Sequence, residues 1–372
     1  MVHHLSRQDA RRLAVSAQAL TADRLPDLMA VARRLTVLQL DPARPVGAPS
    51  AQLVAWSRLG SAYDPAELDD ALDRLELVDL TGFARPAEDI ALFYAEMAAW
   101  PGVDAPAWRI AQEGWIAANA ECHADILERL RQDGPLPASE LPDTCAVPWR
   151  SSGWNNNRNV RMLLDLMVER GEIATAGHDG RERLWDLASR IYPDLPAVPP
   201  DEADRTLRER RLQALGIARA RAAKAPTEPN DVGDVGEEAV VDGVRGTWRV
   251  DPTLLDQPFT GRTAILSPLD RLLIDRKRMV ELFEFDYQLE MFKPAAKRRW
   301  GYWAMPVLYA DRLVGKVDAT ADVGSGVLRV DAVHQDEPFD TAMAGEVQQE
   351  IEDLAQWLEL DLKMSEPVGT DA

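Results

Sequence analysis

The alternation of apolar and polar side chains predicts a short strand near the N-terminus, at residues 37–42 (VLQLDP). In an extended segment the two leucines point to one side, whereas Gln39 and Asp41 point to the other. Pro42 has no N–H and biases Asp41 away from the helical region, so we expect the strand to end there. Taken alone, the pattern is typical of an edge strand with a solvated polar face, because short alternating runs are common.

Helical patterns surround this strand. Ser6 and Asp9 have the spacing of a capping box and predict a helix through residue 20, and a second helix is expected at residues 25–35. A loop and short helices follow the strand. The order of helix, helix, strand, loop and helix indicates a winged-helix-like module over residues 1–105.

Residues 106–192 have the element order of a second winged helix. A long helix is expected to end at Gly134, and a turn and a short helix follow. The next helix is expected to begin in the asparagine run at residues 155–157 and to stop at Gly171. Residues 178–180 (HDG) then predict the turn of a β-hairpin, which would be the wing.

The remaining chain predicts two further modules. After a Pro-rich linker, residues 200–258 indicate an abbreviated third winged helix. Alternating runs and turns at residues 262–362 predict a small β-barrel or a curled antiparallel sheet, with a closing helix. Residues 363–372 are expected to form a disordered tail. The predicted fold class is therefore α+β, with tandem winged-helix modules followed by a small β-barrel.

Composition narrows the class of protein. No apolar run reaches the length of about eighteen residues that would indicate a membrane span. The polar N-terminus lacks the apolar segment of a signal peptide. The two cysteines, Cys122 and Cys145, indicate neither a disulfide framework nor a zinc quartet. The expected location is the cytoplasm.

The charges are unevenly distributed along the chain. The formal net charge of −20 argues against broad electrostatic capture of nucleic acid. Residues 331–361 hold ten acids and no Lys or Arg, whereas residues 205–224 hold seven basic residues and one acid. Residues 276–299 hold seven basic residues and four acids. A single basic run is most often a solvated helix face, but two such stretches also fit a narrow basic surface.

Motifs for phosphate loops, dinucleotide binding, zinc proteases, serine hydrolases and paired thiols are absent. Cys122 and His123 are adjacent on a predicted helix and cannot chelate one metal in the usual way. We therefore predict no metal site and no cofactor, which leaves carboxylate chemistry. Asp270 is a second candidate carboxylate, although a turn or strand cap paired to Arg271 or Arg276 is its commoner role.

Three blocks of sequence resemble the YcaQ-like winged-helix DNA glycosylases, which repair interstrand crosslinks and bulky N-alkyl purines and are related to the azinomycin-resistance glycosylase. The blocks are RRLTVLQLDP; GPLPASELPD with WRSSGWNNNRNVRMLLDLMVERGEI and GRERLWDLASRIYP; and SPLDRLLIDRKRMVELFEFDYQLEMFKPAAKRRWGYWAMPVLYADRLVGKVD. The third is the most specific, because its length, spacing and order of charged and aromatic residues all agree. The resemblance covers most of residues 6–335.

The resemblance implies tandem winged-helix modules and a β-barrel arranged as a C-shaped clamp around DNA. The family's catalytic signature is Gln, an apolar residue, then Gln or Asp, and it falls on Gln39, Leu40 and Asp41. It implies a monofunctional DNA glycosylase that releases N-alkylated purines; whether crosslinks are also unhooked stays open. Asp41 would stabilise the sugar cation and activate water, and Gln39 would help to hold water or substrate.

Double-stranded DNA is the implied partner. The sequence contains no dimerisation heptad, so we expect a monomer, associated with the nucleoid if the source is bacterial. The residues expected to contact DNA are polar and basic side chains of the predicted helix, hairpin and second basic stretch: Asn156, Asn157, Arg158, Arg161, Arg181, Arg183, Arg276, Lys277, Arg278, Lys297, Arg298 and Arg299.

The chain departs from the family pattern downstream of the predicted strand. Many members carry a His-Glu-Ala-Ser-like stretch there, whereas residues 80–89 read LTGFARPAED and offer Arg85 as a possible supporting residue. The hairpin at residues 172–185 is the nearest candidate for a lesion probe. The alternative function is a non-catalytic winged-helix DNA-binding protein or regulator, which would share the fold and the basic stretches.

Overall fold

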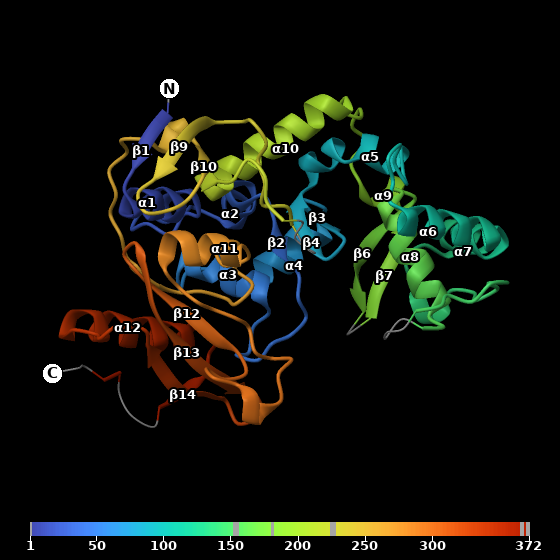
Figure 1. Ribbon diagram of the computed structural model, residues 1–372. Coiled ribbons are helices and arrows are strands. Elements are labelled where there is room, and N and C mark those ends of the chain that lie inside the picture. Colours follow the sequence, from blue (N-terminus) through green and yellow to red (C-terminus); the bar gives the residue numbers. More distant parts are fainter. Residues whose placement is uncertain (1, 152–155, 180–181, 224–227, 365–367, 370–372) are drawn as a thin grey trace. The chain divides into compact units, whose positions relative to one another are not determined.

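The protein has a mixed α+β fold that divides into two compact units, one formed by residues 1–68 with 207–372 and the other by residues 69–206. The structure is a computed structural model, shown in Figure 1. It describes residues 2–151, 156–179, 182–223, 228–364 and 368–369. The first unit is discontinuous in sequence, whereas the second is a single stretch of chain.

The first unit contains most of the strands. Its helices are α1 (Arg7–Ala17), α2 (Leu28–Leu35), α3 (Ser50–Leu59), α11 (Arg276–Arg278) and α12 (Thr341–Trp357), while α4 (Ala66–Asp73) and α10 (Pro200–Leu215) cross the unit boundaries. Its strands are β1 (Val2–Leu5), β2 (Leu38–Gln39), β8 (Ile217–Ala218), β9 (Glu237–Val241), β10 (Thr247–Val250), β11 (Thr263–Ile265), β12 (Ala304–Tyr309), β13 (Arg312–Asp322), β14 (Val327–Gln335) and β15 (Asp361–Met364).

Strands β11 to β15 form one sheet in chain order, which curls into half a barrel. Its pairs are antiparallel except that β15 runs parallel to β14. Strands β11 and β15 are its two edges, so the described strands form the curled sheet that the sequence predicts as one of two alternatives, and not a complete barrel. Helix α12 packs beside β11 and is capped by Asp340, whose side chain accepts a hydrogen bond from Met343 N. A helix therefore lies where the sequence predicts the last helix of the chain.

A second sheet of this unit has the order β1–β9–β10–β8. Strands β9 and β10 form an antiparallel hairpin within residues 200–258, and β1, which was not predicted, pairs in parallel with β9. Ser6 ends β1 and caps α1 through the predicted capping box with Asp9. The apolar side of α1 joins Trp248 and the half-barrel in one core.

The second unit contains the predicted helix, turn, helix and hairpin in that order. Its helices are α5 (Tyr94–Ala98), α6 (Ala107–Ala118), α7 (Ala120–Asp133), α8 (Asn159–Glu169) and α9 (Ala188–Ile191). Its strands are β3 (Leu77–Leu80), β4 (Phe83–Pro86), β5 (Leu136–Pro137), β6 (Ile173–Asp179) and β7 (Glu182–Leu187), with 3-10 turns at Ala87–Leu92 and Ala138–Glu140. Strands β5, β7 and β6 form a sheet in that order.

The single long helix predicted before Gly134 is wrong, because the chain breaks at Asn119 into α6 and α7. Asn119 is buried, and its amide nitrogen donates to the carbonyls of Trp115 (2.9 Å) and Val147 (3.1 Å). Its amide oxygen accepts from Val147 N at 2.9 Å. These bonds fix the loop before α8, and a sequence pattern does not reveal such a long-range contact.

Two predicted boundaries also change. Helix α8 starts at Asn159, later than the predicted start at residues 155–157, because the Asn159 side chain accepts from Trp149 N (2.8 Å) and holds the incoming loop. Asn155 itself lies outside the described residues. In the predicted disordered tail, Lys363 and Met364 belong to β15, and most later residues lie outside the described part.

A fully buried ion pair joins α3 to the segment after β11. Arg58 and Asp270 are both completely shielded from solvent, and the guanidinium binds both carboxylate oxygens. Asp270 also accepts a hydrogen bond from Leu272 N at 2.9 Å. Asp270 is therefore structural, and its partner is Arg58 rather than the predicted Arg271 or Arg276.

Candidate active site

The predicted catalytic residues, Gln39 and Asp41, lie at and just after β2, which follows α2. Helix α2 ends at Thr36, whose backbone is left-handed (φ 66°), and the chain then turns into the short strand. Val37 and Leu38 are buried, with 4% and 1% of their surface exposed. Gln39 and Asp41 are half-buried. Val37 and Leu38 thus anchor the segment in the core, while the side-chain amide of Gln39 and the carboxylate of Asp41 remain partly exposed to solvent.

The strand is shorter than predicted because the chain turns at Asp41. The Asp41 amide donates to the Gln39 carbonyl at 3.2 Å, and its carboxylate oxygen Oδ1 accepts from Ala43 N at 2.8 Å. Asp side chains commonly stabilise turns through such a bond to the backbone two residues on. As a result Leu40 is half-buried rather than packed opposite Gln39, and regular alternation ends at Gln39.

The two polar side chains keep unused hydrogen-bonding capacity. Within the described ranges, Asp41 has no ion-pair partner, and its second carboxylate oxygen Oδ2 makes no hydrogen bond. In the same ranges, the Gln39 side chain makes no hydrogen bond either. A carboxylate oxygen and an amide can therefore bind water or a polar ligand here without first breaking an internal contact.

The chain after Asp41 is held by the half-barrel. The Pro45 carbonyl accepts from Ala321 N on β13 at 2.8 Å. The hydroxyls of Ser50 and Ser267, both buried, lie 2.7 Å apart at the start of α3. This support fixes the backbone on the C-terminal side of the polar pair, and fixed polar groups stabilise developing charge without reorganising.

The chemistry available at Asp41 is that of a carboxylate. The first lysine of the chain is Lys224, and Lys316 in the half-barrel is fully buried and paired with Asp336 at 2.5 Å. Burial lowers the pKa of Lys316, and the Asp336 carboxylate opposes that shift. The sequence of residues 1–223 contains no lysine, and Lys316 is engaged within the half-barrel. Burial, with Cys122 beside it, raises the pKa of the Cys145 thiol, which makes it a poor nucleophile.

One predicted DNA-contacting set, residues 297–299, lies on a loop of the first unit. Lys297 and Arg299 are exposed, whereas Arg298 is half-buried, donates to the Lys293 carbonyl at 2.9 Å and lies over the ring of Tyr302. Arg298 therefore helps to shape the loop, and the two exposed side chains carry its accessible positive charge.

The buried carboxylate of Glu290 organises this loop. It accepts from the backbone amides of Arg299 (2.7 Å) and Trp300 (2.8 Å), and from Lys293 Nζ (2.8 Å). Phe292 projects from the same loop with 88% of its surface exposed. Neither residue was predicted from the sequence, although both stand within the basic stretch at residues 276–299.

The other basic residues of the first unit are split between surface and core. Arg276 and Lys277 are exposed, but Arg278 is only 2% exposed and donates to the Leu215 carbonyl. Burial lowers the pKa of Arg278 to about 10. Its prediction as a DNA contact is wrong, because the short α11 turns this third side chain into the core.

In the second unit, the predicted residues before and on α8 lie at the surface. Asn156, Asn157, Arg158 and Arg161 are exposed. The backbone N–H of Asn157 donates to the Trp149 carbonyl at 3.0 Å, and Asn157 has a left-handed backbone conformation (φ 58°). The segment therefore presents amides and guanidinium groups at the N-terminal end of a helix, an arrangement that suits phosphate contacts.

The remaining predicted residues of this unit are partly engaged. Arg183 on β7 lies 3.6 Å from the buried Asp79 carboxylate and stacks over Trp185. Arg85 on β4 is only 8% exposed and lies over the ring of Phe93. Arg181 lies outside the described residues. Arg85 therefore sits in the second unit's interior, where its guanidinium packs on an aromatic ring.

Comparison with known proteins identifies the family. The family model for DNA glycosylase AlkZ-like proteins matches residues 32–357, which include the segment of Gln39 and Asp41. The chain belongs to the AlkZ-like DNA glycosylase family. It is therefore a DNA glycosylase, as the sequence resemblance implies.

A solved structure shares the fold of this AlkZ-like protein. DNA glycosylase AlkZ of Streptomyces sahachiroi is 18% identical and matches with a TM-score of 0.66. The match covers 97% of this chain and 100% of that chain. At this identity the likeness bears on the fold alone.

In the part of the chain that the structure describes, we find no helix with the length and apolar character needed to span a membrane.

Proposed function

We propose that this AlkZ-like protein is a monofunctional glycosylase that releases N-alkylated purines from double-stranded DNA. The observation that carries the proposal is the polar pair formed by Gln39 on β2 and Asp41 in the turn that follows it. Asp41 keeps a carboxylate oxygen without an internal partner, and Gln39 keeps its amide, on a backbone fixed by the half-barrel. A glycosylase needs such groups beside the sugar and the attacking water.

The chemistry follows from the charge of an alkylated base. A purine alkylated at N7 is positively charged, so the bond from sugar C1′ to N9 breaks with both electrons leaving on the base. The transition state carries positive charge on the sugar, and the Asp41 carboxylate stabilises it. Water then bonds to C1′, and Asp41 accepts the proton that it loses. Gln39 orients that water, and the reaction needs neither a cofactor nor a lysine.

Binding is proposed to use surfaces of both units, with the protein acting as a monomer. In the second unit, α7, α8 and the hairpin of β6 and β7 would act as a winged helix, with α8 directed to the groove. The modules at residues 1–105 and 200–258 would have related folds. The implied C-shaped clamp is a prediction that small-angle scattering of the free protein would test.

Neutralising the exposed basic residues of the half-barrel loop should weaken DNA binding and flatten its salt dependence. In the Lys297→Ala/Arg299→Ala variant, loss of two phosphate contacts should reduce the slope of log K against log salt by about 2. Fluorescence anisotropy with duplex DNA at several salt concentrations would measure it.

A matched control removes two arginines that already have carboxylate partners. Arg312 on β13 pairs with Glu337, and Arg329 on β14 pairs with Asp331. The Arg312→Ala/Arg329→Ala variant should keep the wild-type salt slope. An equal loss of slope in both variants would mean that net charge, rather than the loop, governs binding.

The proposed activity is tested by base release. Wild-type protein incubated with duplex DNA that contains 7-methylguanine should release the free base and leave an abasic site in an uncut strand. Strand cleavage would then require alkali. A parallel assay on DNA with an interstrand crosslink asks whether unhooking belongs to the activity. Tight duplex binding without release from any alkylated substrate would instead support a non-catalytic DNA-binding protein.

A further inference from the structure

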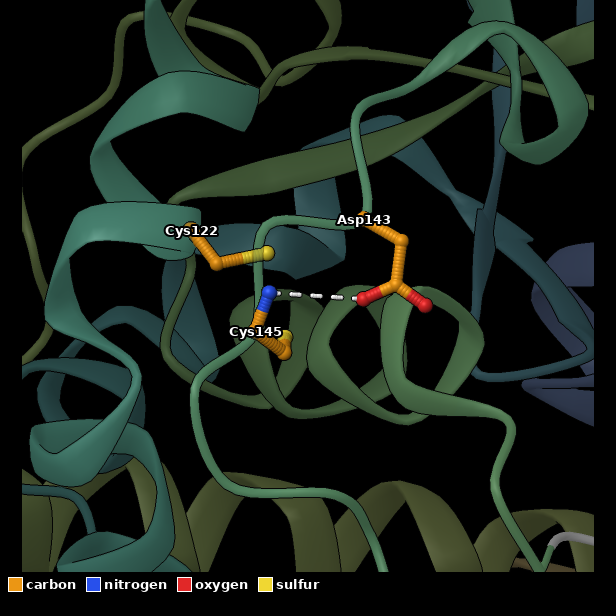
Figure 2. Close-up of side chains that lie close together, drawn as sticks. All are labelled: Cys122, Asp143 and Cys145. Atoms are coloured by element: carbon orange, nitrogen blue, oxygen red, sulfur yellow. Dashed lines mark hydrogen bonds between the residues drawn. The ribbon is translucent and has the colours of Figure 1, made fainter.

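The fold brings together the only two cysteines of the chain. Cys122 lies on α7 and is fully buried, while Cys145 is half-buried in the loop before α8. Figure 2 shows both with Asp143, and the ligand atoms of the three residues all lie within 4.8 Å of one another. Both cysteines are free thiols. They are separated by 22 intervening residues, so sequence spacing alone gave no metal motif.

The loop that carries two of these residues is held from both sides. On one side, Asn119 binds the backbone of Val147 through hydrogen bonds of 2.9 and 3.1 Å. On the other, the amide of Asn159 donates to both carboxylate oxygens of Asp143, at 3.2 Å each. The three ligand atoms are therefore gathered before any ion binds, which reduces the entropy that binding must overcome.

We propose that Cys122, Cys145 and Asp143 form a binding site for a thiophilic divalent metal ion of the zinc class. Two thiolates and one carboxylate suit Zn²⁺, and water would complete four-coordination. Calcium and magnesium are disfavoured, because these hard ions prefer all-oxygen sites. Binding breaks the two S–H bonds, and both protons leave to solvent as the two metal–sulfur bonds form.

The contacts of Asp143 indicate what the ion would do. A carboxylate that binds a metal is usually oriented by a further hydrogen bond, and Asn159 supplies it here. Asn159 is also the first residue of α8. A bound ion would therefore join α7 to the start of α8 and stiffen that connection. It is a structural site in residues 69–206, whereas Gln39 and Asp41 belong to the other unit.

Metal content of the whole protein tests this proposal. Protein purified without chelator should contain about one Zn²⁺ per chain, and the Cys145→Ser and Asp143→Asn variants should lose most of it. Asp143→Asn keeps an acceptor for the Asn159 amide, so loss of zinc there reports the ligand rather than the loop. Asp125→Asn is the matched control, because among the described residues the Asp125 side chain accepts a hydrogen bond only from the nearby Thr144 hydroxyl (2.7 Å), and this variant should retain zinc.

Two measurements on the wild-type protein make the result independent of variant folding. Cobalt substitution should give the sulfur-to-metal charge-transfer absorption of a thiolate site, and a strong chelator should lower the melting temperature. A metal-free protein with two thiols that react freely would overturn the proposal. So would a mass lower by two hydrogen atoms, because it would mean that the cysteines form a disulfide.

Discussion

The Asp41→Asn variant should lose base-releasing activity by about 10²- to 10⁴-fold, the range by which a positioned acid–base group accelerates reactions. Asparagine is nearly isosteric and keeps the oxygen that accepts from Ala43 N, so the turn should persist. It carries no charge to stabilise the sugar cation and does not accept the proton of water. Single-turnover release of 7-methylguanine from duplex DNA would measure the loss.

Asp64→Asn provides a matched control for this prediction. Asp64 is exposed, and its carboxylate likewise accepts from a backbone amide two residues on, that of Ala66 at 2.9 Å. The control variant should release base at the wild-type rate. Equal rates for wild type and Asp41→Asn would refute the proposed role of Asp41 without disproving a glycosylase activity elsewhere in the protein.

The second large effect concerns stability. Arg58→Ala should lower the free energy of unfolding by about 3–5 kcal/mol, since it leaves the Asp270 carboxylate charged and unpaired in the core. Arg58 also donates to the Gln18 carbonyl (3.1 Å) and to the Ser57 hydroxyl (2.8 Å), and both acceptors would lose their partner. Urea unfolding followed by circular dichroism would measure the change.

Two comparison variants isolate the buried charge. Arg74→Ala breaks an exposed ion pair with Asp70 at the C-terminal end of α4 and should cost less than about 0.5 kcal/mol. The double variant Arg58→Met/Asp270→Leu removes both charges and should cost less than the two single changes together. A small effect of Arg58→Ala alone would mean that water reaches Asp270.

The segment at residues 37–42 shows what local patterning can predict. Alternation and Pro42 predicted a strand that ends near Asp41, and the structure has β2 at this place. The pattern did not reveal the turn at Asp41, because the bond from Ala43 N to the carboxylate replaces the strand geometry. The turn changes the neighbours of Leu40 but leaves the polar pair accessible.

Contacts between distant segments explain what the sequence did not reveal. A basic run predicted DNA contacts, yet Arg278 binds the carbonyl of Leu215, more than sixty residues earlier. Asp270 looked like a local cap, and its partner Arg58 is 212 residues away. The two cysteines gave no motif, and only the packing of α7 against the loop before α8 brings them together. Such pairings depend on the assembled fold rather than on local periodicity.

The discontinuous first unit sets an order for folding during synthesis. Residues 69–206 form one continuous unit, so they can fold as soon as they leave the ribosome. Strand β1 cannot pair until β9 has been synthesised. The Pro45 carbonyl, which helps to hold the backbone after Asp41, cannot accept its hydrogen bond until Ala321 has been synthesised. The candidate active site is thus encoded near the start of the chain but completed near its end, so an incomplete chain should bind no lesion productively.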